Sequence, residues 1–135
     1  MEDLVKTLLK KAKDAAQNAY APYSKFPVGT ALIDDHGNFF SGGNVENLAF
    51  PSGICAEQVA IGKAVSEVGP SFTISMLLVY TPTQKVTTPC GSCRQVINEF
   101  ATPETRIVSV CDSEEHLDIT FTELHPHATM IDKLK

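Results

Sequence analysis

Three of the four cysteines stand in two short segments, "CAEQ" at 55–58 and "TTPCGSCRQ" at 87–95. Cys90 and Cys93 are three residues apart at the start of a predicted helix, so both thiolates can face the same side of its first turn and hold one metal ion. Cys55 opens a second predicted helix. If the N-termini of these helices lie together, three sulfurs converge and the helix dipoles favour their negative charge. The pattern therefore indicates a zinc site.

Such a site would have chemistry beyond metal binding. Three protein ligands leave the fourth tetrahedral position open, which is typical of catalytic zinc, whereas a structural site closes with a fourth ligand. Glu57 lies two residues after Cys55, near the metal but not required as a ligand. Its carboxylate can take a proton from an activated water and return it to a leaving group. Glu57 is therefore the predicted catalytic residue.

Other interpretations of the cysteines remain open. Cys55 alone could be a packed small hydrophobe, since cysteine is often buried. The "CGSC" pair could be a redox pair, although the thioredoxin type of pattern follows the first strand of its fold and would leave a third cysteine unexplained. Cys111 ends a predicted strand and is expected in the core. If Cys111 or a histidine completed the coordination, the protein would be a non-catalytic, zinc-stabilised binding module.

The elements that must position these side chains follow from hydrophobic periodicity and from turn residues. The pattern predicts helices at 4–19, 55–69 and 90–100, strands at 26–33, 39–47, 74–80 and 106–111, a hairpin turn at 34–38, and a weak strand, a helical turn and a tail within 116–135. This order predicts an α/β sandwich with parallel central strands.

Length and composition limit the protein class. With 135 residues and 43% hydrophobic content, the chain is expected to form one domain, residues 1–135. It has neither the apolar core of a signal peptide nor a run near the ~20 apolar residues of a membrane span, so we expect a cytoplasmic protein with no membrane partner. The net charge of −5 and the scattered basic residues argue against binding to nucleic-acid polymers.

Four motifs together resemble one family. "CAE" followed by "PCGSCRQV" is similar to the signature of the small zinc-dependent cytidine deaminases. "APYSKFPVGTAL" and "GGNVEN" resemble two further motifs of that family, in the same order and spacing, over about residues 20–100. The resemblance implies a three-layer α/β/α sandwich with a mixed central sheet, and a homotetramer.

The same resemblance implies the chemistry. One Zn²⁺ per chain would be bound by Cys55, Cys90 and Cys93, and Glu57 would shuttle protons while an activated water attacks C4 of the pyrimidine. Cytidine or deoxycytidine would become uridine or deoxyuridine, with release of ammonia, as in pyrimidine salvage. Deamination of a modified cytosine nucleoside such as blasticidin S is the alternative activity, because the related blasticidin S deaminases also lack the arginine discussed below.

Substrate contacts are predicted from the segment "GGNVEN". Asn44 and Glu46 alternate on a predicted strand, so both can face the ribose hydroxyls, although polar alternation is also typical of a solvated strand face. The resemblance adds Phe26, against the base, and Ala56. The charge of Glu46 disfavours a nearby phosphate and no arginine cluster offsets it, so we expect a free nucleoside as substrate.

The sequence also departs from the family pattern. An arginine commonly follows "CAE" in the family, whereas this chain has Gln58. Because Gln58 brings no positive charge, we expect Arg94 to be the main cation that draws negative charge off the sulfurs, unless residue 58 faces solvent and matters little. Near the C-terminus, His125, His127 and Thr129 stand where the family tends to have a leucine–proline stretch with an aromatic residue.

Overall fold

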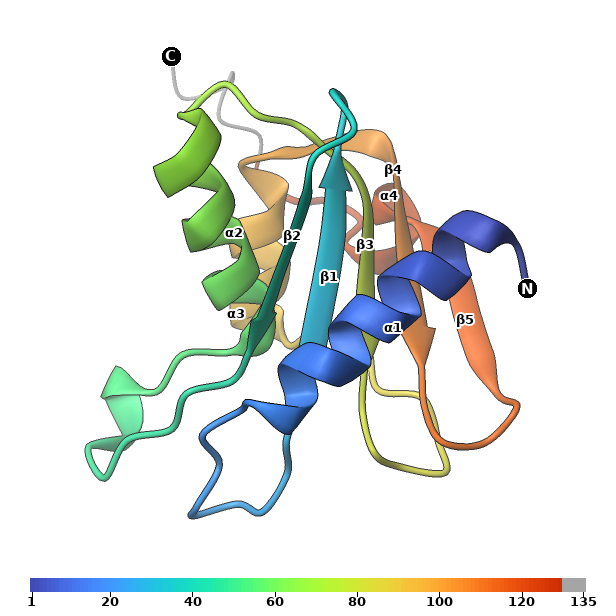
Figure 1. The fold of residues 1–135 in the computed structure, drawn as a ribbon. Coiled ribbons are helices and arrows are strands. Elements are labelled where there is room, and N and C mark those ends of the chain that lie inside the picture. The colour runs from blue at the N-terminus through green and yellow to red at the C-terminus, as the bar shows by residue number, and fades with distance from the viewer. Residues whose placement is uncertain (130–135) are drawn as a thin grey trace.

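The computed structural model describes residues 1–129, which form a five-stranded sheet with helices on both faces (Figure 1). In chain order the elements are α1 (Asp3–Gln17), β1 (Gly29–Asp34), β2 (Phe39–Gly43), the 3₁₀ helix η1 (Phe50–Ser52), α2 (Ala56–Val68), β3 (Ile74–Tyr80), α3 (Gly91–Asn98), β4 (Ala101–Val110), β5 (His116–Thr120) and α4 (Phe121–Leu124). The last part of the predicted tail, residues 130–135, lies outside the described residues. No helix within 1–129 has the length and apolarity needed to cross a membrane.

The sheet is mixed, with strand order β2-β1-β3-β4-β5. β1 runs antiparallel to both β2 and β3, β3 and β4 are parallel, and β5 returns antiparallel to β4. The mixed sheet is confirmed, whereas the expectation of parallel central strands is correct for the β3–β4 pair and wrong for β1. β1 forms a hairpin with β2, and this hairpin joins the sheet with β1 antiparallel to β3. The connection from β3 to β4 passes through α3, as parallel strands require.

Two apolar cores make the sheet the middle of three layers. α1 covers one face, while α2, α3 and α4 lie against the other (Figure 1). Buried residues of the first core include Val5, Leu8, Ala12, Ala31, Met76, Leu78 and Val108. Those of the second core include Leu32, Ala60, Ile61, Leu77, Val79, Ile97, Ile107, Phe121 and Leu124. The predicted three-layer α/β/α sandwich is confirmed.

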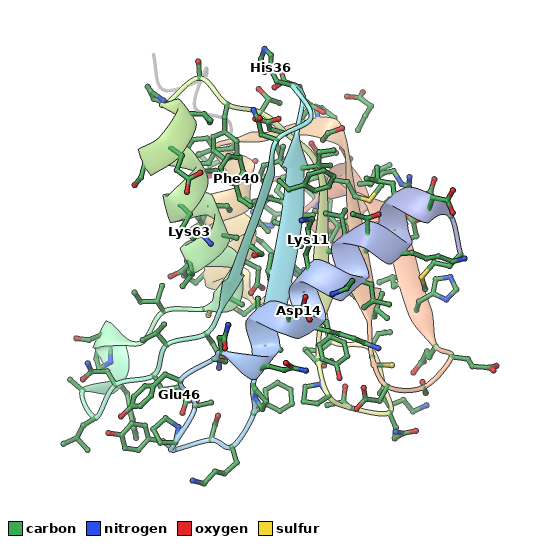
Figure 2. The ribbon with its side chains drawn as sticks, in the orientation of Figure 1. Lys11, Asp14, His36, Phe40, Glu46 and Lys63 are labelled. Atoms are coloured by element: carbon green, nitrogen blue, oxygen red, sulfur yellow. The ribbon has the colours of Figure 1, made fainter. Side chains whose placement is uncertain are left out.

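The hairpin turn predicted at 34–38 is held by one buried carboxylate. Asp34 Oδ1 accepts hydrogen bonds from the backbone N–H groups of His36 (2.9 Å) and Asn38 (2.7 Å), and Asn38 Nδ2 donates to Asp34 Oδ2 at 3.0 Å. Burial alone would raise the pKa of Asp34, but these hydrogen bonds outweigh it and hold the pKa below its ordinary value. The turn lies at the opposite end of the sheet from Glu46 (Figure 2).

The second predicted strand ends earlier than the sequence pattern indicates. β2 stops at Gly43, so the prediction of a strand through residue 47 is wrong. After Gly43 the backbone pairs with segments outside the sheet, because Tyr20 N–H donates to Asn44 O at 2.9 Å and Val45 forms a bridge with Ile54. The chain therefore leaves the sheet toward the loop that follows α1.

We predict that the contact between α1 and β1 tolerates no side chain at residue 29. A Cβ on Gly29 would lie 1.8 Å from the Ala12 carbonyl oxygen, so α1 would have to move. Gly29→Ala should lower the free energy of unfolding by about 3 kcal/mol, as overpacking does. The matched control is Gly62→Ala in α2, which meets nothing within 4 Å. It should raise that free energy by up to about 1 kcal/mol, since alanine is the better helix former. Equal urea midpoints for the two variants would contradict this packing.

Candidate active site

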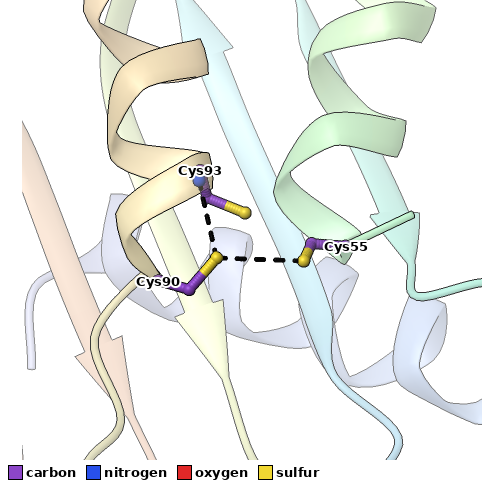
Figure 3. A group of neighbouring side chains, drawn as sticks. All are labelled: Cys55, Cys90 and Cys93. Carbon is purple, nitrogen blue, oxygen red and sulfur yellow. Dashed lines mark hydrogen bonds between the residues drawn. The ribbon is translucent and has the colours of Figure 1, made fainter. Parts of the chain in front are cut away.

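Three thiols converge where two helices begin (Figure 3). Cys55 is the N-cap of α2, Cys90 is the N-cap of α3, and Cys93 lies in the first turn of α3. The Sγ atoms of Cys55 and Cys90 are 4.0 Å apart, and all three sulfurs lie within 4.8 Å of one another. A tetrahedral zinc ion with Zn–S bonds near 2.3 Å separates its sulfur ligands by about 3.8 Å. The three thiols therefore fit one zinc ion.

The protonation of these thiols depends on burial and on their contacts with one another. Burial raises the pKa of the Cys55 and Cys93 thiols. Burial acts in the same direction on Cys90, but the Cys93 N–H, which donates to Cys90 Sγ at 3.5 Å, and the neighbouring thiols outweigh it, so the pKa of Cys90 is lowered. A divalent cation among the sulfurs would draw the protons off all three groups.

Glu57 is the buried carboxyl of the site. It lies in the first turn of α2 and is only 4% exposed. Burial raises its pKa above the ordinary value, and its own backbone N–H, the Cys93 thiol and the Thr30 hydroxyl, which lie beside the carboxylate, act in the opposite direction. Across the described residues no lysine or arginine forms an ion pair with it. Glu57 is consequently more basic than a glutamate in water, as suits a group that accepts a proton.

A pocket of about 290 Å³ opens beside the thiols. The predicted residues that line it are Phe26, Asn44, Glu46, Cys55, Ala56, Glu57 and Cys90. The lining residues that sequence reasoning missed are Ser24, Val28, Val79, Thr81, Thr87 and Thr88. Thr87 and Thr88 directly precede "PCGSC", and this position could have indicated them. Val28 and Val79 look like ordinary strand residues, so no pattern in the sequence marks them.

Asn44 holds one wall of this pocket. Its Oδ1 accepts from the Val28 N–H at 2.9 Å and its Nδ2 donates to the Phe26 carbonyl at 3.1 Å. The side chain thus fixes the backbone on both sides of residue 27. β2 ends before residues 44 and 46. Both side chains nevertheless point to the same side, as predicted, because each forms hydrogen bonds with the segment 23–28.

Glu46 fixes the start of the same segment. Its Oε1 accepts from the backbone N–H groups of Tyr23 (3.0 Å) and Ser24 (3.1 Å). Hydrogen bonds from Ser24, with a further contribution from Tyr23, hold the pKa of Glu46 below its ordinary value. Figure 2 shows the side chain at the end of the molecule where the loop after α1 lies. Glu46 is therefore ionised at neutral pH and lies at the pocket wall.

Gln58 contacts the sulfur site directly. Its Nε2 lies 3.8 Å from Cys93 Sγ and 3.4 Å from Ser92 Oγ, with the amide as donor to both atoms. The amide can stabilise negative charge on the sulfur as a hydrogen-bond donor, without adding a positive charge. Gln58 thus faces α3, which excludes the alternative that it points only into solvent.

Arg94 makes its hydrogen bonds to oxygen atoms. Its Nε donates to the Pro89 carbonyl (2.8 Å), one terminal nitrogen donates to the Leu124 carbonyl (2.8 Å), and the other donates to Thr88 Oγ1 (2.9 Å). The guanidinium therefore holds the loop that leads into Cys90. That its charge also acts on the sulfurs stays a prediction.

Cys111 lies apart from the three thiols. Its Sγ contacts Ser113 Oγ at 3.2 Å and the Glu115 carbonyl at 3.4 Å. Within residues 1–129, neither Cys111 nor a histidine joins the cluster of Cys55, Cys90 and Cys93.

Comparison with known proteins identifies the family. Residues 3–109 match the model of the cytidine and deoxycytidylate deaminase zinc-binding region. The chain belongs to the zinc-dependent cytidine deaminase family. It is 47% identical to the cytidine deaminase of Sporosarcina psychrophila over 96 residues, which cover 71% of this chain and 69% of that protein. It is 37% identical to the cytidine deaminase of Halalkalibacterium halodurans over 90% of both chains.

A solved structure supports the same assignment. The 1.6 Å crystal structure of cytidine deaminase from Burkholderia pseudomallei superposes with a TM-score of 0.86 at 34% identity, covering 96% of this chain and all of that chain. The expected family is therefore confirmed. Membership in a family defined by a zinc-binding region, together with the fit of the three thiols, also bears out zinc as the cofactor.

We predict that this deaminase chain binds one zinc ion through the three converging thiols. Replacing Cys55, Cys90 or Cys93 by alanine should abolish stoichiometric zinc, because two thiols remain in each variant. Cys111→Ala is the matched control and should keep its zinc, since that thiol bonds elsewhere. Metal analysis of the purified proteins by mass spectrometry measures both. Loss of zinc from Cys111→Ala would show that the site is closed by a fourth protein ligand.

Proposed function

We propose that this protein deaminates cytidine and deoxycytidine hydrolytically, giving uridine and deoxyuridine and releasing ammonia. The observation that carries the proposal is a pocket of about 290 Å³ lined by Cys55, Cys90 and the buried carboxyl of Glu57, with Cys93 completing the thiol cluster beside it. Relatives named cytidine deaminase, similar over most of this chain, support the same substrate class. A non-catalytic zinc module would need a fourth protein ligand, and a blasticidin S deaminase has no support among these relatives.

The residues of the site divide the reaction between them. Bound by Cys55, Cys90 and Cys93, zinc would supply a Lewis acid that lowers the pKa of a water molecule. Glu57 takes the proton that this water loses, because burial has made its carboxyl more basic. It gives this proton to the ring nitrogen N3, then takes the second proton of the same water from the hydroxyl now bonded to C4 and gives it to the departing amine. Water is consumed and ammonia leaves, so the atoms balance.

Binding of the sugar falls to the opposite wall of the pocket. Oε1 of Glu46 accepts from two backbone N–H groups, which leaves its other oxygen to accept a hydrogen bond from a ribose hydroxyl. Phe26 and Ala56 supply apolar surface for the base, and Asn44 keeps Phe26 in position. The negative charge of Glu46 disfavours a phosphate close by. The substrate is therefore a free nucleoside.

The assembly and location are part of the proposal. We infer a homotetramer in the cytoplasm, built from single-domain chains of residues 1–135. Two large apolar side chains in the segment between β2 and α2, Leu48 (78% exposed) and Phe50 (77% exposed), favour contact with a second subunit. Gln58 and Arg94 support the site from the side of α3, through a sulfur contact and through the loop before Cys90.

The wild-type protein and Glu57→Gln test the function together. The wild type should release ammonia from cytidine and deoxycytidine, and markedly less from cytosine, cytidine monophosphate and blasticidin S. Glu57→Gln keeps the size of the side chain but removes proton transfer, so kcat should fall by about 10²–10⁴-fold. Zinc content should be unchanged, which distinguishes lost proton transfer from a lost metal. A wild-type preference for blasticidin S, or full turnover by Glu57→Gln, would overturn the proposal.

Two substitutions at Glu46 test the sugar contact. Glu46→Ala should lower kcat/KM for cytidine far more than for free cytosine, because a hydroxyl partner is lost only when ribose is present. Glu46→Gln keeps an oxygen acceptor for the Tyr23 and Ser24 N–H groups and should therefore lose less than Glu46→Ala. Steady-state kinetics on both substrates measure the ratio. Equal losses on cytidine and cytosine would return Glu46 to a purely structural role in the loop.

A further inference from the structure

Thr30 lies beneath the active site, outside the pocket wall. It belongs to β1, where side chains alternate between the two cores: Ala31 faces α1, and Leu32 packs with α2 and α3. Thr30 therefore faces α2 and α3. Its register partner on β3 is Val79, which lines the pocket. Thr30 itself is fully buried and is absent from the pocket lining.

The hydroxyl of Thr30 has no partner of its own. Its Oγ1 is shielded from solvent and makes no hydrogen bond of ordinary geometry with any described residue. A buried hydroxyl left in this way destabilises a protein. The same hydroxyl lies beside the carboxylate of Glu57, which is 4% exposed and has few other polar neighbours. A valine would fill this space without the unfavourable hydroxyl, and what sets this hydroxyl apart is its place beside Glu57.

We propose that Thr30 is a positioning residue for Glu57, whose hydroxyl donates a hydrogen bond to the carboxylate and orients it toward the substrate. The inference rests on the proposed deaminase function, since it assigns a task to the proton-carrying group. Catalytic hydrogen bonds are often long or poorly aligned before substrate binds and tighten in the complex. The unmade bond between these two neighbours has that character. Thr30 acts through Glu57 and touches no substrate.

The sheet offers a matched control in the same row. Ser109 of β4 is the register partner of Val79, so it lies on the far side of Val79 from Thr30 and faces the same core. Ser109 is 1% exposed, and its Oγ also lacks a hydrogen-bond partner within residues 1–129. Thr30 is among the groups that act on the Glu57 carboxylate, and Ser109 is not. Its removal deletes an equivalent buried hydroxyl without the proposed role.

Four variants test the inference: Thr30→Val, Thr30→Ser, Thr30→Ala and Ser109→Ala. Thr30→Val replaces the hydroxyl by a methyl group of similar size, and kcat for cytidine should fall about 10- to 100-fold, as expected for a hydrogen bond to a charged group. KM and zinc content should stay at wild-type values, because Thr30 does not line the pocket and does not belong to the thiol cluster. The melting temperature should hold or rise, since an unpaired hydroxyl has gone. Ser109→Ala should leave kcat unchanged.

The serine and alanine variants remove the effect of packing. Both lack the Thr30 methyl group and differ only in the hydroxyl, so a cavity affects them alike. Thr30→Ser should keep most of the wild-type kcat, while Thr30→Ala should match Thr30→Val. This pair decides the question even if Thr30→Val folds poorly.

Each unfavourable result has a distinct meaning. Equal kcat values for Thr30→Ser and Thr30→Ala, or wild-type kcat in Thr30→Val, would overturn the positioning role while the deaminase function stands. A loss of kcat in Ser109→Ala as large as that in Thr30→Val would also overturn it, since any buried hydroxyl in the row would then serve. Failure of the wild-type protein to release ammonia from cytidine would overturn the proposed function and this inference with it.

Discussion

The meeting of two helix N-termini is the constraint on which the rest of the site depends. Parallel strands need a crossover, and α3 fills the one between β3 and β4. α2 lies beside it on the same face of the sheet, so Cys55 and Cys90, the N-caps of the two helices, come within 4.0 Å. Unpaired N–H groups and the positive ends of both helix dipoles then face the same small volume. With a divalent cation bound, these groups add to the stabilisation of three thiolates that would otherwise repel one another.

The basicity of Glu57 follows from the same packing. The first turn of α2 places Ala56 and Glu57 against the sheet, where both are buried. The helix N-terminus and nearby donors favour the ionised carboxylate, but loss of water outweighs them and raises the pKa. A carboxyl in this position binds a proton more readily than one in water. Its polar neighbours still stabilise the ionised form. The fold thus supplies both the metal ligands and the base from the N-caps and first turns of two neighbouring helices.

How much of this the sequence predicted depends on how local each interaction is. The 3.6-residue periodicity and the spacing of Cys90 and Cys93 are local, so the helices and this pair of thiols were predictable, as was the turn closed by Asp34. Cys55 joins them across 35 residues, and its place was predicted only on the condition that the two helix N-termini meet. The early end of β2 was not, since it depends on pairing between Tyr20 and Asn44, 24 positions apart in the chain. The role proposed for the Thr30 hydroxyl was likewise not predictable, because Thr30 comes close to Glu57 only when β1 and α2 pack together.

Gln58 and Arg94 show how contacts distant in the sequence add roles to those that a motif suggests. That Arg94 compensates the charge of the sulfurs stays a prediction, and in addition its three nitrogens bond to oxygens, one of them the Leu124 carbonyl thirty residues away. The sulfur contact belongs to the neutral amide of Gln58. Arg94 therefore ties the end of α4 to the loop that leads into Cys90, and it links the position of that thiol to the packing of α4. A change in how α4 packs would reach the metal site through this one guanidinium.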